Sequence, residues 1–345
     1  MLNRFRPKVR NFEKIKFSFI ENKKDHIVSP SQKRQPASVA ASAIEPSANS
    51  ITLSGTPMPE TTSQVAEPAN GMVYAIGTLG YDFGTEARRD TFKQLMPPYT
   101  IQGSQIPANP YDARQMVDYL AENLSEMKSL IWTLNLESPV YAIEPTGSLS
   151  GNVYAILQDL LAGQVEAEDS AAYIERVNIP GLITGRTVRL FSGQVVPVIE
   201  LPSPRVMYGW HVNTLVDAAL EAVGAKQDAD EKQMRRTLSS FLNRIYYDLR
   251  NLGQTSQDRA LNFAATNAFQ AAQTFSEAVG AGMELGSINV SKSPFCRLDN
   301  DCWDVQLKFF DPEDYRRAKN FRFTIDVSDL MPVTLGEVRS WSSSD

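Results

Sequence analysis

Hydrophobic residues recur with helical spacing between residues 230 and 279. In the first half of this stretch apolar residues follow steps of three and four, and Lys and Arg occupy much of the opposite face, which is typical of an amphipathic helix. The apolar positions are Met234, Leu238, Phe241, Leu242, Ile245, Tyr246, Leu249 and Leu252. The pattern therefore predicts a long helix with one buried face and one solvent-exposed face.

The second half of the stretch predicts another amphipathic helix, which packs closely against the first. Its apolar positions step by four and three, and the alanines among them permit a short distance between the two helix axes. These positions are Leu261, Ala265, Ala268, Ala272, Phe275 and Val279. Thr255 or Ser256 can cap the helix, with Asp258 in its first turn. Residues 230–279 thus predict a helical hairpin with a short turn.

Beyond Gly286 the spacing of the apolar residues changes from helical to alternating. Residues 303–309 and 321–327 each place apolar side chains on one face and polar side chains on the other, as in amphipathic antiparallel strands. With residues 288–290 and the final VTLGEVRSW, they predict a sheet of three or four strands that covers the hairpin. We expect residues 204–341 to form this two-layer α+β domain, followed by a short tail at 342–345.

The preceding region, residues 71–203, predicts a small α/β or α+β domain. VYAIGTL is typical of a buried strand and EARRDTFKQLM of a helix, and residues 173–201 have the β-branched and glycine content of two or three strands. Helices are also predicted at 111–124, 125–134 and 152–163, with a strand at SPVYAIEP. PSPR at 202–205 places the domain boundary near residue 203.

Composition separates residues 1–70 from the rest of the chain. Residues 1–34 hold ten basic residues against three acidic ones, and residues 35–70 hold no basic and no aromatic residue. Such segments bury too little apolar surface to offset the entropy of ordering, so we expect a disordered basic arm and a Ser/Ala/Pro linker. The remaining residues carry 24 basic against 34 acidic side chains, which disfavours a nucleic acid partner.

Two features bear on the location of the protein. No apolar run reaches the roughly 18 to 20 residues of a membrane-spanning helix. The N-terminal arm also lacks the apolar region and the cleavage site of a secretory signal. We therefore expect no membrane span and a cytoplasmic protein.

Candidate catalytic chemistry is sparse. The chain has two histidines, and His26 lies in the arm, so a catalytic triad or an imidazole zinc site would depend on His211 alone. No nucleophile-elbow or zinc-protease motif occurs. The sequence accordingly predicts no catalytic residue, no metal site and no cofactor.

Cys296 and Cys302 bracket a short acidic segment in FCRLDNDCWD. Three interpretations stay open for them. Two reduced, partly buried cysteines are favoured by a reducing compartment; a redox pair closing a small loop is compatible with the spacing; and a zinc site would lack ligands. The redox pair is the tentative site that the sequence offers.

Aromatic residues are numerous in the C-terminal domain, and those outside the helical seam would offer a rigid apolar surface to a peptide. On the hairpin, four residues that packing does not explain are predicted partner contacts. They are Arg244, Tyr247, Arg250 and Asn251. Exposed helix faces also self-associate, so a homodimer is a further expectation.

Several long strings resemble the C-terminal region of PatG-type cyanobactin maturation proteases, a region that also ends the PatA-type enzymes. Between residues 206 and 341 they are FLNRIYYDLRNLG, TSQDRALNFAATNAFQAA, KSPFCRLDNDCWDVQLKFFDP and FRFTIDVSDLMPVTLGEVRSW. Upstream they are VYAIGTLGYDFGTEARRDTFKQLMP, SLIWTLNL and SGQVVPVI. The resemblance therefore covers about residues 71–341.

The resemblance implies a place in ribosomal peptide maturation and a cyanobacterial source, although this region of the family is a domain of unknown function. In the family, peptide cutting belongs to a preceding subtilisin-like domain, whose Asp, His and Ser motifs do not occur here. We therefore expect a noncatalytic accessory or scaffold protein that binds a subtilisin-like maturation protease or its precursor peptide. The alternatives are an enzyme of unrecognised type that uses the two cysteines, and a dimerisation module.

Overall fold

The computed structural model describes residues 71–101, 103–205, 207–211, 251–270, 282–297, 299–314 and 316–344, with six further positions between 213 and 278. The chain divides into two units, Met1–Thr62 and Ser63–Asp345, and all the elements below belong to the second. The predicted arm and linker at 1–70 lie outside the described residues. No helix among those residues is long and apolar enough to cross a membrane.

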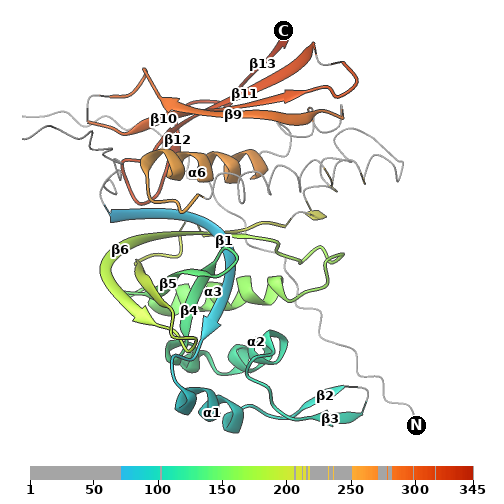
Figure 1. The fold of residues 1–345 in the computed structure, drawn as a ribbon, viewed down its shortest axis with the longest axis vertical. Helices are drawn as coiled ribbons and strands as arrows, with labels where there is room; N and C mark the ends of the chain where they lie inside the picture. Colours follow the sequence, from blue (N-terminus) through green and yellow to red (C-terminus); the bar gives the residue numbers. More distant parts are fainter. Residues whose placement is uncertain are drawn as a thin grey trace, which may run out of the picture. The chain divides into compact units, whose positions relative to one another are not determined.

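The N-terminal half of this unit is built on a six-stranded sheet with the order β1-β4-β5-β7-β6-β8. The strands are β1 (Met72–Asp82), β4 (Ile131–Asn135), β5 (Pro139–Pro145), β6 (Val177–Arg189), β7 (Val195–Leu201) and β8 (Tyr208–Gly209). β1 pairs with β6 through residues 72–77 and with β4 through residues 78–82, so β1, β4, β5, β7 and β6 form a closed circuit. Figure 1 shows β1 and β6 curving as this closure requires.

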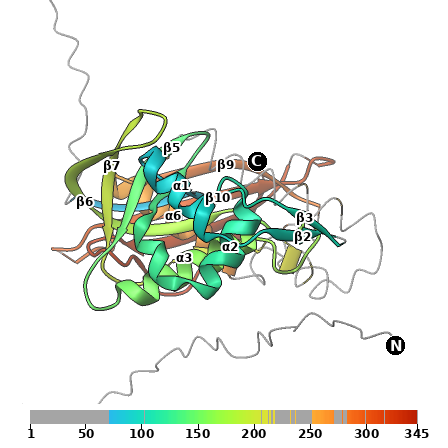
Figure 2. The same ribbon diagram turned by 90° about the horizontal axis from the view of Figure 1, so that it is seen from below.

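Three α-helices and a 3-10 helix pack their apolar side chains against this sheet. They are α1 (Glu86–Leu95), α2 (Ala113–Glu122), the 3-10 helix η2 (Leu124–Ser129) and α3 (Ser150–Gln164), and a small hairpin of β2 (Tyr99–Ile101) and β3 (Ser104–Ile106) follows α1. Side-chain oxygens of Thr85 and Asp112 cap α1 and α2. α2 and α3 lie against each other (Figure 2), where Gln158 Nε2 donates to the Val117 carbonyl.

One predicted helix, at 125–134, is wrong. Its first part belongs to η2, and Ile131–Asn135 form β4 between β1 and β5. Trp132 and Leu134 are fully buried in that strand. A short apolar run has no period that separates a helix from a buried strand, so pairing with β1 and β5 decides its conformation.

The C-terminal half is an antiparallel five-stranded sheet with α6 (Ser256–Gln270) packed on one face (Figure 1). The strands are β9 (Glu284–Lys292), β10 (Cys302–Phe310), β11 (Arg317–Asp326), β12 (Val333–Thr334) and β13 (Arg339–Ser344). The predicted alternation in 303–309 and 321–327 is confirmed: Val305 lies opposite Phe323 and Leu307 opposite Phe321, and all four are buried. The mixed α+β class is confirmed with them.

α6 is buried on every side along residues 259–266, although the sequence predicts an amphipathic helix. It lies between the five-stranded sheet and β1 (Figure 1). β1 contributes to two cores, because Tyr74 and Ile76 face α6 while Val73 and Ala75 join the core of the six-stranded sheet. The contact with β1 therefore removes the solvent-exposed face that the sequence predicts for this helix.

The predicted helical hairpin is described only in part. Its second helix begins where predicted, and Thr255 Oγ1 accepts a hydrogen bond from the N–H of Asp258 at 3.1 Å. The first helix, at 230–252, lies outside the described residues except for a few positions, and most of the seam beyond residue 270 does so too. The hairpin as a whole stays a prediction.

The boundary near residue 203 also stays a prediction. β8 pairs with β6 beyond that residue, so the six-stranded sheet takes in residues 208 and 209. At the other end, residues 342–344 belong to β13, which pairs with β11. Part of the predicted C-terminal tail is therefore strand.

Candidate functional site

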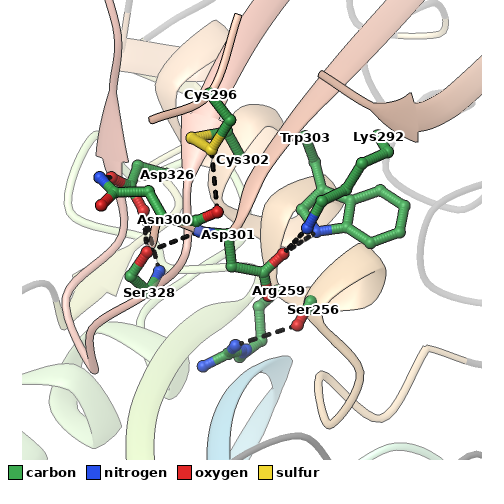
Figure 3. Close-up of polar contacts among 10 residues, drawn as sticks. All are labelled: Ser256, Arg259, Lys292, Cys296, Asn300, Asp301, Cys302, Trp303, Asp326 and Ser328. Atoms are coloured by element: carbon green, nitrogen blue, oxygen red, sulfur yellow. Dashed lines mark hydrogen bonds and ion pairs between the residues drawn. A yellow bond between two sulfur atoms is a disulfide. The ribbon is translucent and has the colours of Figure 1, made fainter. Parts of the chain in front are cut away.

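Cys296 and Cys302 form a disulfide at one end of the five-stranded sheet (Figure 3). Their Cα atoms are 5.5 Å apart. Cys302 opens β10, and the N–H of Ser293 donates to its carbonyl at 2.9 Å, which turns the chain after β9 back over β10. The favoured prediction of two reduced thiols is therefore wrong. Among the described residues, no group of three His, Cys, Asp or Glu side chains is placed to hold a metal ion.

The loop between β9 and β10 is anchored to the turn after β11. Asn300 Nδ2 donates to the Asp326 carboxylate at 2.5 Å. The N–H of Val327 donates to the Asp301 carbonyl at 2.9 Å, and the N–H of Asp301 donates to Ser328 Oγ at 2.8 Å. The disulfide and these bonds fix both ends of the loop.

Asp301 directs its carboxylate toward α6 from this loop (Figure 3). The carboxylate forms an ion pair with Lys292 and accepts a hydrogen bond from Trp303 Nε1 at 2.8 Å. Lys292 Nζ also lies 5.2 Å from the centre of the Trp303 ring. Partial burial alone would raise the pKa of Asp301, but hydrogen bonds from Lys292, Ser256 and Trp303 outweigh it and the pKa is below its ordinary value.

Arg259, on the second turn of α6, is a buried charged residue and belongs to the candidate site. The residue is 1% exposed, and its Nη2 donates to Ser256 Oγ at 3.3 Å. In the part of the chain that the structure describes, its Nε and Nη1 have no hydrogen-bond partner. Burial lowers the pKa of Arg259, and the charge of Asp301 opposes that effect. Ser256 thus joins a buried cation to the carboxylate of the disulfide loop.

Arg259 is not among the sites predicted from the sequence, although its neighbours on the helix indicate an unusual environment. Positions three and four residues away on the helix hold Thr255, Ser256, Asn262 and Phe263, so no carboxylate on α6 can neutralise the guanidinium. A basic residue in such a context needs a partner from another element. Asp301 comes from a loop that only the folded sheet brings to α6.

Asn251, a predicted partner contact, has an internal role instead. It is 6% exposed, and it forms a reciprocal amide pair with Asn262, with N···O distances of 2.7 and 3.2 Å. Asn262 Nδ2 also donates to the Tyr74 carbonyl at 2.6 Å, and Asn251 Oδ1 accepts from the N–H of Gly253 at 2.8 Å. The pair joins the start of α6 to β1. The other three predicted contacts, Arg244, Tyr247 and Arg250, lie outside the described residues.

His211 lies next to β8 and is half-buried. Burial lowers its pKa, and backbone hydrogen bonds with Tyr173 and Ala171 oppose that effect only in part. A surface groove of about 510 Å³ lies between the start of α2 and the segment after α3, with Tyr111 and Tyr173 in its lining. The groove carries charges of both signs, and no described contact brings a nucleophile to His211.

Large apolar side chains are exposed around the disulfide end of the five-stranded sheet. Phe295 is 72% exposed and Val333 is 49% exposed, with Met331 and Leu335 also exposed. Val333 lies opposite Asp326, which lies opposite Cys302, so these residues belong to the same end of the sheet. We call Phe295, Met331, Val333 and Leu335 the Phe295 surface.

Two family models match the chain, PatG C-terminal over residues 228–341 and PatG Domain over residues 72–185. A solved structure described as "PatG Domain of Unknown Function" is similar to it, with 56% sequence identity and a TM-score of 0.70. That match covers 79% of this chain and 99% of the other. The chain belongs to the PatG family. No curated protein matches it.

The features described above lie in two different matched regions. The disulfide, Asp301, Arg259 and the Phe295 surface fall within the PatG C-terminal match, and β1 to β5 fall within the PatG Domain match. The buried amide pair and the Arg259 contacts place α6 of the PatG C-terminal region against β1 and the disulfide loop. The candidate site is therefore a feature of the PatG C-terminal region.

Proposed function

We propose that this PatG-family chain is a noncatalytic accessory protein of ribosomal peptide maturation, which binds a processing protease or its precursor peptide. The observation that carries the proposal is the Phe295 surface. Phe295 stands 72% exposed on a loop, with three exposed aliphatic side chains at the same end of the sheet. Large apolar side chains left exposed at one end of a sheet are typical of a protein interaction site.

The construction of the loop supports a binding role. A disulfide and the contacts of Asn300 and Asp301 hold the loop on both sides, so little conformational freedom is lost when a partner covers Phe295. Charged and polar residues surround the apolar side chains, among them the exposed Arg297, Asp299 and Asp329. An aromatic anchor within a polar rim is the arrangement that dominates binding energy in protein interfaces.

The test is calorimetric titration of the full chain with the subtilisin-like maturation protease and, separately, with the precursor peptide. Replacing Phe295→Ser and Val333→Ser together should weaken binding of the partner about thirtyfold, the equivalent of about 2 kcal/mol for a lost hot spot. Light scattering on the free chain measures any homodimer, so that self-association is not counted as partner binding.

Leu95→Ser is the matched control, because Leu95 is 52% exposed on α1, in the PatG Domain part of the chain. This variant should bind as tightly as the unmodified protein. Absence of binding to both partners at high micromolar concentration would refute the proposal, and so would equal losses in the control and in the double variant.

A redox or peptide-modifying activity of Cys296 and Cys302 is the second candidate function, and the disulfide favours it. Replacing both cysteines with Ser should then change the products of a reconstituted maturation reaction. Unchanged products with the Ser variant would leave the accessory role as the better account.

A further inference from the structure

We propose that the Cys296–Cys302 disulfide is a redox-exchangeable site for a dithiol reductant, and that its oxidised form holds Asp301 in place as the counter-charge of the buried Arg259. The oxidised and reduced proteins then differ in two segments, the β9–β10 loop and the first turns of α6. This inference does not depend on the binding role proposed above, because it concerns the disulfide, its loop and α6 and does not involve the Phe295 surface.

The two cysteine residues differ in exposure, and this decides where a reductant attacks. Cys302 is fully buried, whereas Cys296 is partly exposed between the exposed residues Phe295 and Arg297. An attacking thiolate therefore reaches Sγ of Cys296, and Cys302 is the leaving group. The positive charge of Arg297 favours the approach of a thiolate.

The exchange breaks the disulfide bond between the two cysteines and forms one between the two sulfur atoms of the dithiol. The first thiolate of the dithiol forms a mixed disulfide with Cys296, and Cys302 leaves and takes up a proton. The second thiolate then attacks the first sulfur of the same dithiol, and Cys296 leaves and is protonated. The protein pair gains two electrons and two protons, and the dithiol is oxidised to a disulfide.

A purely structural role explains this bond poorly. The cysteines are 6 residues apart in the sequence, and cross-links that close short loops restrict the unfolded chain least. The core beneath is already closed by α6 and by side chains such as Val305 and Phe323. The bond instead fixes a loop whose polar groups reach two other elements.

Asp301 is the group that connects this loop to α6. Its carboxylate is bonded to Lys292, Trp303 and Ser256, and Ser256 in turn accepts from Arg259 (Figure 3). Reduction leaves the loop held by hydrogen bonds and by the ion pair with Lys292. Sγ of Cys296 lies 3.0 Å from the carbonyl oxygen of Asn300, so the new thiol can donate to the residue before Asp301. The tie between loop and helix loosens as a result.

The experiment is hydrogen–deuterium exchange on the full chain in its oxidised form and after treatment with dithiothreitol under native conditions. Reduction should make Cys296 reactive to alkylation without unfolding. It should raise deuterium uptake in residues 293–301 and 255–262 and leave residues 131–145 of the six-stranded sheet unchanged. The variant with Cys296→Ser and Cys302→Ser should show the same raised uptake with and without the reductant.

Asp301→Asn separates the two halves of the proposal. In the oxidised protein this variant should raise uptake in 255–262 while residues 293–299 keep the uptake of the unmodified chain. The proposal fails if Cys296 reacts only after global unfolding. It also fails if reduction changes 293–301 without changing 255–262, or if uptake rises equally in the six-stranded sheet.

Discussion

Two polar networks border the first turns of α6, and they differ in how completely their groups are paired. Asn251 and Asn262 bond each other, the Tyr74 carbonyl and the N–H of Gly253, so the amide groups have partners on every side. Arg259 makes one hydrogen bond, to Ser256, and two of its nitrogens have no partner in the described part of the chain. One network is neutral and closed, and the other is charged and incomplete.

The difference separates a structural device from a candidate site. A closed network of buried amides specifies how α6 docks on β1, since any shift would leave several groups without partners. A buried guanidinium with one neutral partner is costly, and its offset comes from Asp301 on a loop that a disulfide restrains. A group held by so few contacts responds to changes in that loop, whereas the amide network does not.

The largest expected effect is on the closed network. Asn262→Leu keeps the volume but leaves the Asn251 amide and the Tyr74 carbonyl without this partner, so the free energy of unfolding should fall by about 3 kcal/mol. Urea denaturation measures the change. Gln257→Ala, at an exposed position of α6, is the control and should stay within about 0.5 kcal/mol. A loss below about 1 kcal/mol for Asn262→Leu would show that the network is not essential.

Removing the charge from the incomplete network should have a smaller effect on the free energy of unfolding, and of opposite sign. Arg259→Met keeps the aliphatic packing and removes a buried charge, so stability should stay equal or rise by about 1 kcal/mol. Arg259→Ala also removes the packing and should lose about 2 kcal/mol. Both are read from the same denaturation curves. If the Met variant loses as much as the Ala variant, the guanidinium has a strong partner and the contrast with the amide pair disappears.

The smallest expected effect is the pH dependence that Asp301 contributes. Its pKa is lowered in the folded protein, so its stabilising contribution is present above the unfolded value of about 4 and is lost as the pH falls through the folded pKa. Asp301→Asn should therefore be less stable than the unmodified chain at pH 7. The loss should stay below about 1 kcal/mol, because the pair with Lys292 is partly exposed and Arg259 keeps its hydrogen bond to Ser256 in the variant. The difference should close as the pH falls below about 4 and through the folded pKa of Asp301. If the difference in stability persists at low pH, it comes from altered packing of the side chain and not from the lost charge.

Much of the fold follows from periodicity in the sequence. The alternation in 303–309 and 321–327 predicts β10 and β11 because one face of their sheet is buried and the other is polar. The start of α6 follows from Thr255, whose hydroxyl caps the helix in the structure. The error at 125–134 has the same origin: an apolar run without a clear period does not distinguish a helix from a strand buried between two neighbours.

The candidate site is less predictable, because its residues come from separate elements. FCRLDNDCWD shows that Cys296 and Cys302 are close in sequence, but the register of β9, β10 and β11 and the turn at Ser293 decide that they pair. Asn251 looks like a surface residue of a helix, yet it is buried and pairs with Asn262, whose amide donates to the Tyr74 carbonyl of β1. Local sequence carries no information about a contact with an element 188 residues away in the chain.

The sequence by itself determined the class of fold and the strands of the C-terminal sheet, because these depend on local patterns of apolar and polar residues. It also carried the PatG resemblance, which depends on long matching strings of residues. Only the tertiary structure decided that α6 is buried on all sides and that Arg259 lies inside. The reason is that burial depends on the neighbouring elements. β1 and the five-stranded sheet cover α6, and positions that the sequence alone leaves exposed become part of a buried polar network.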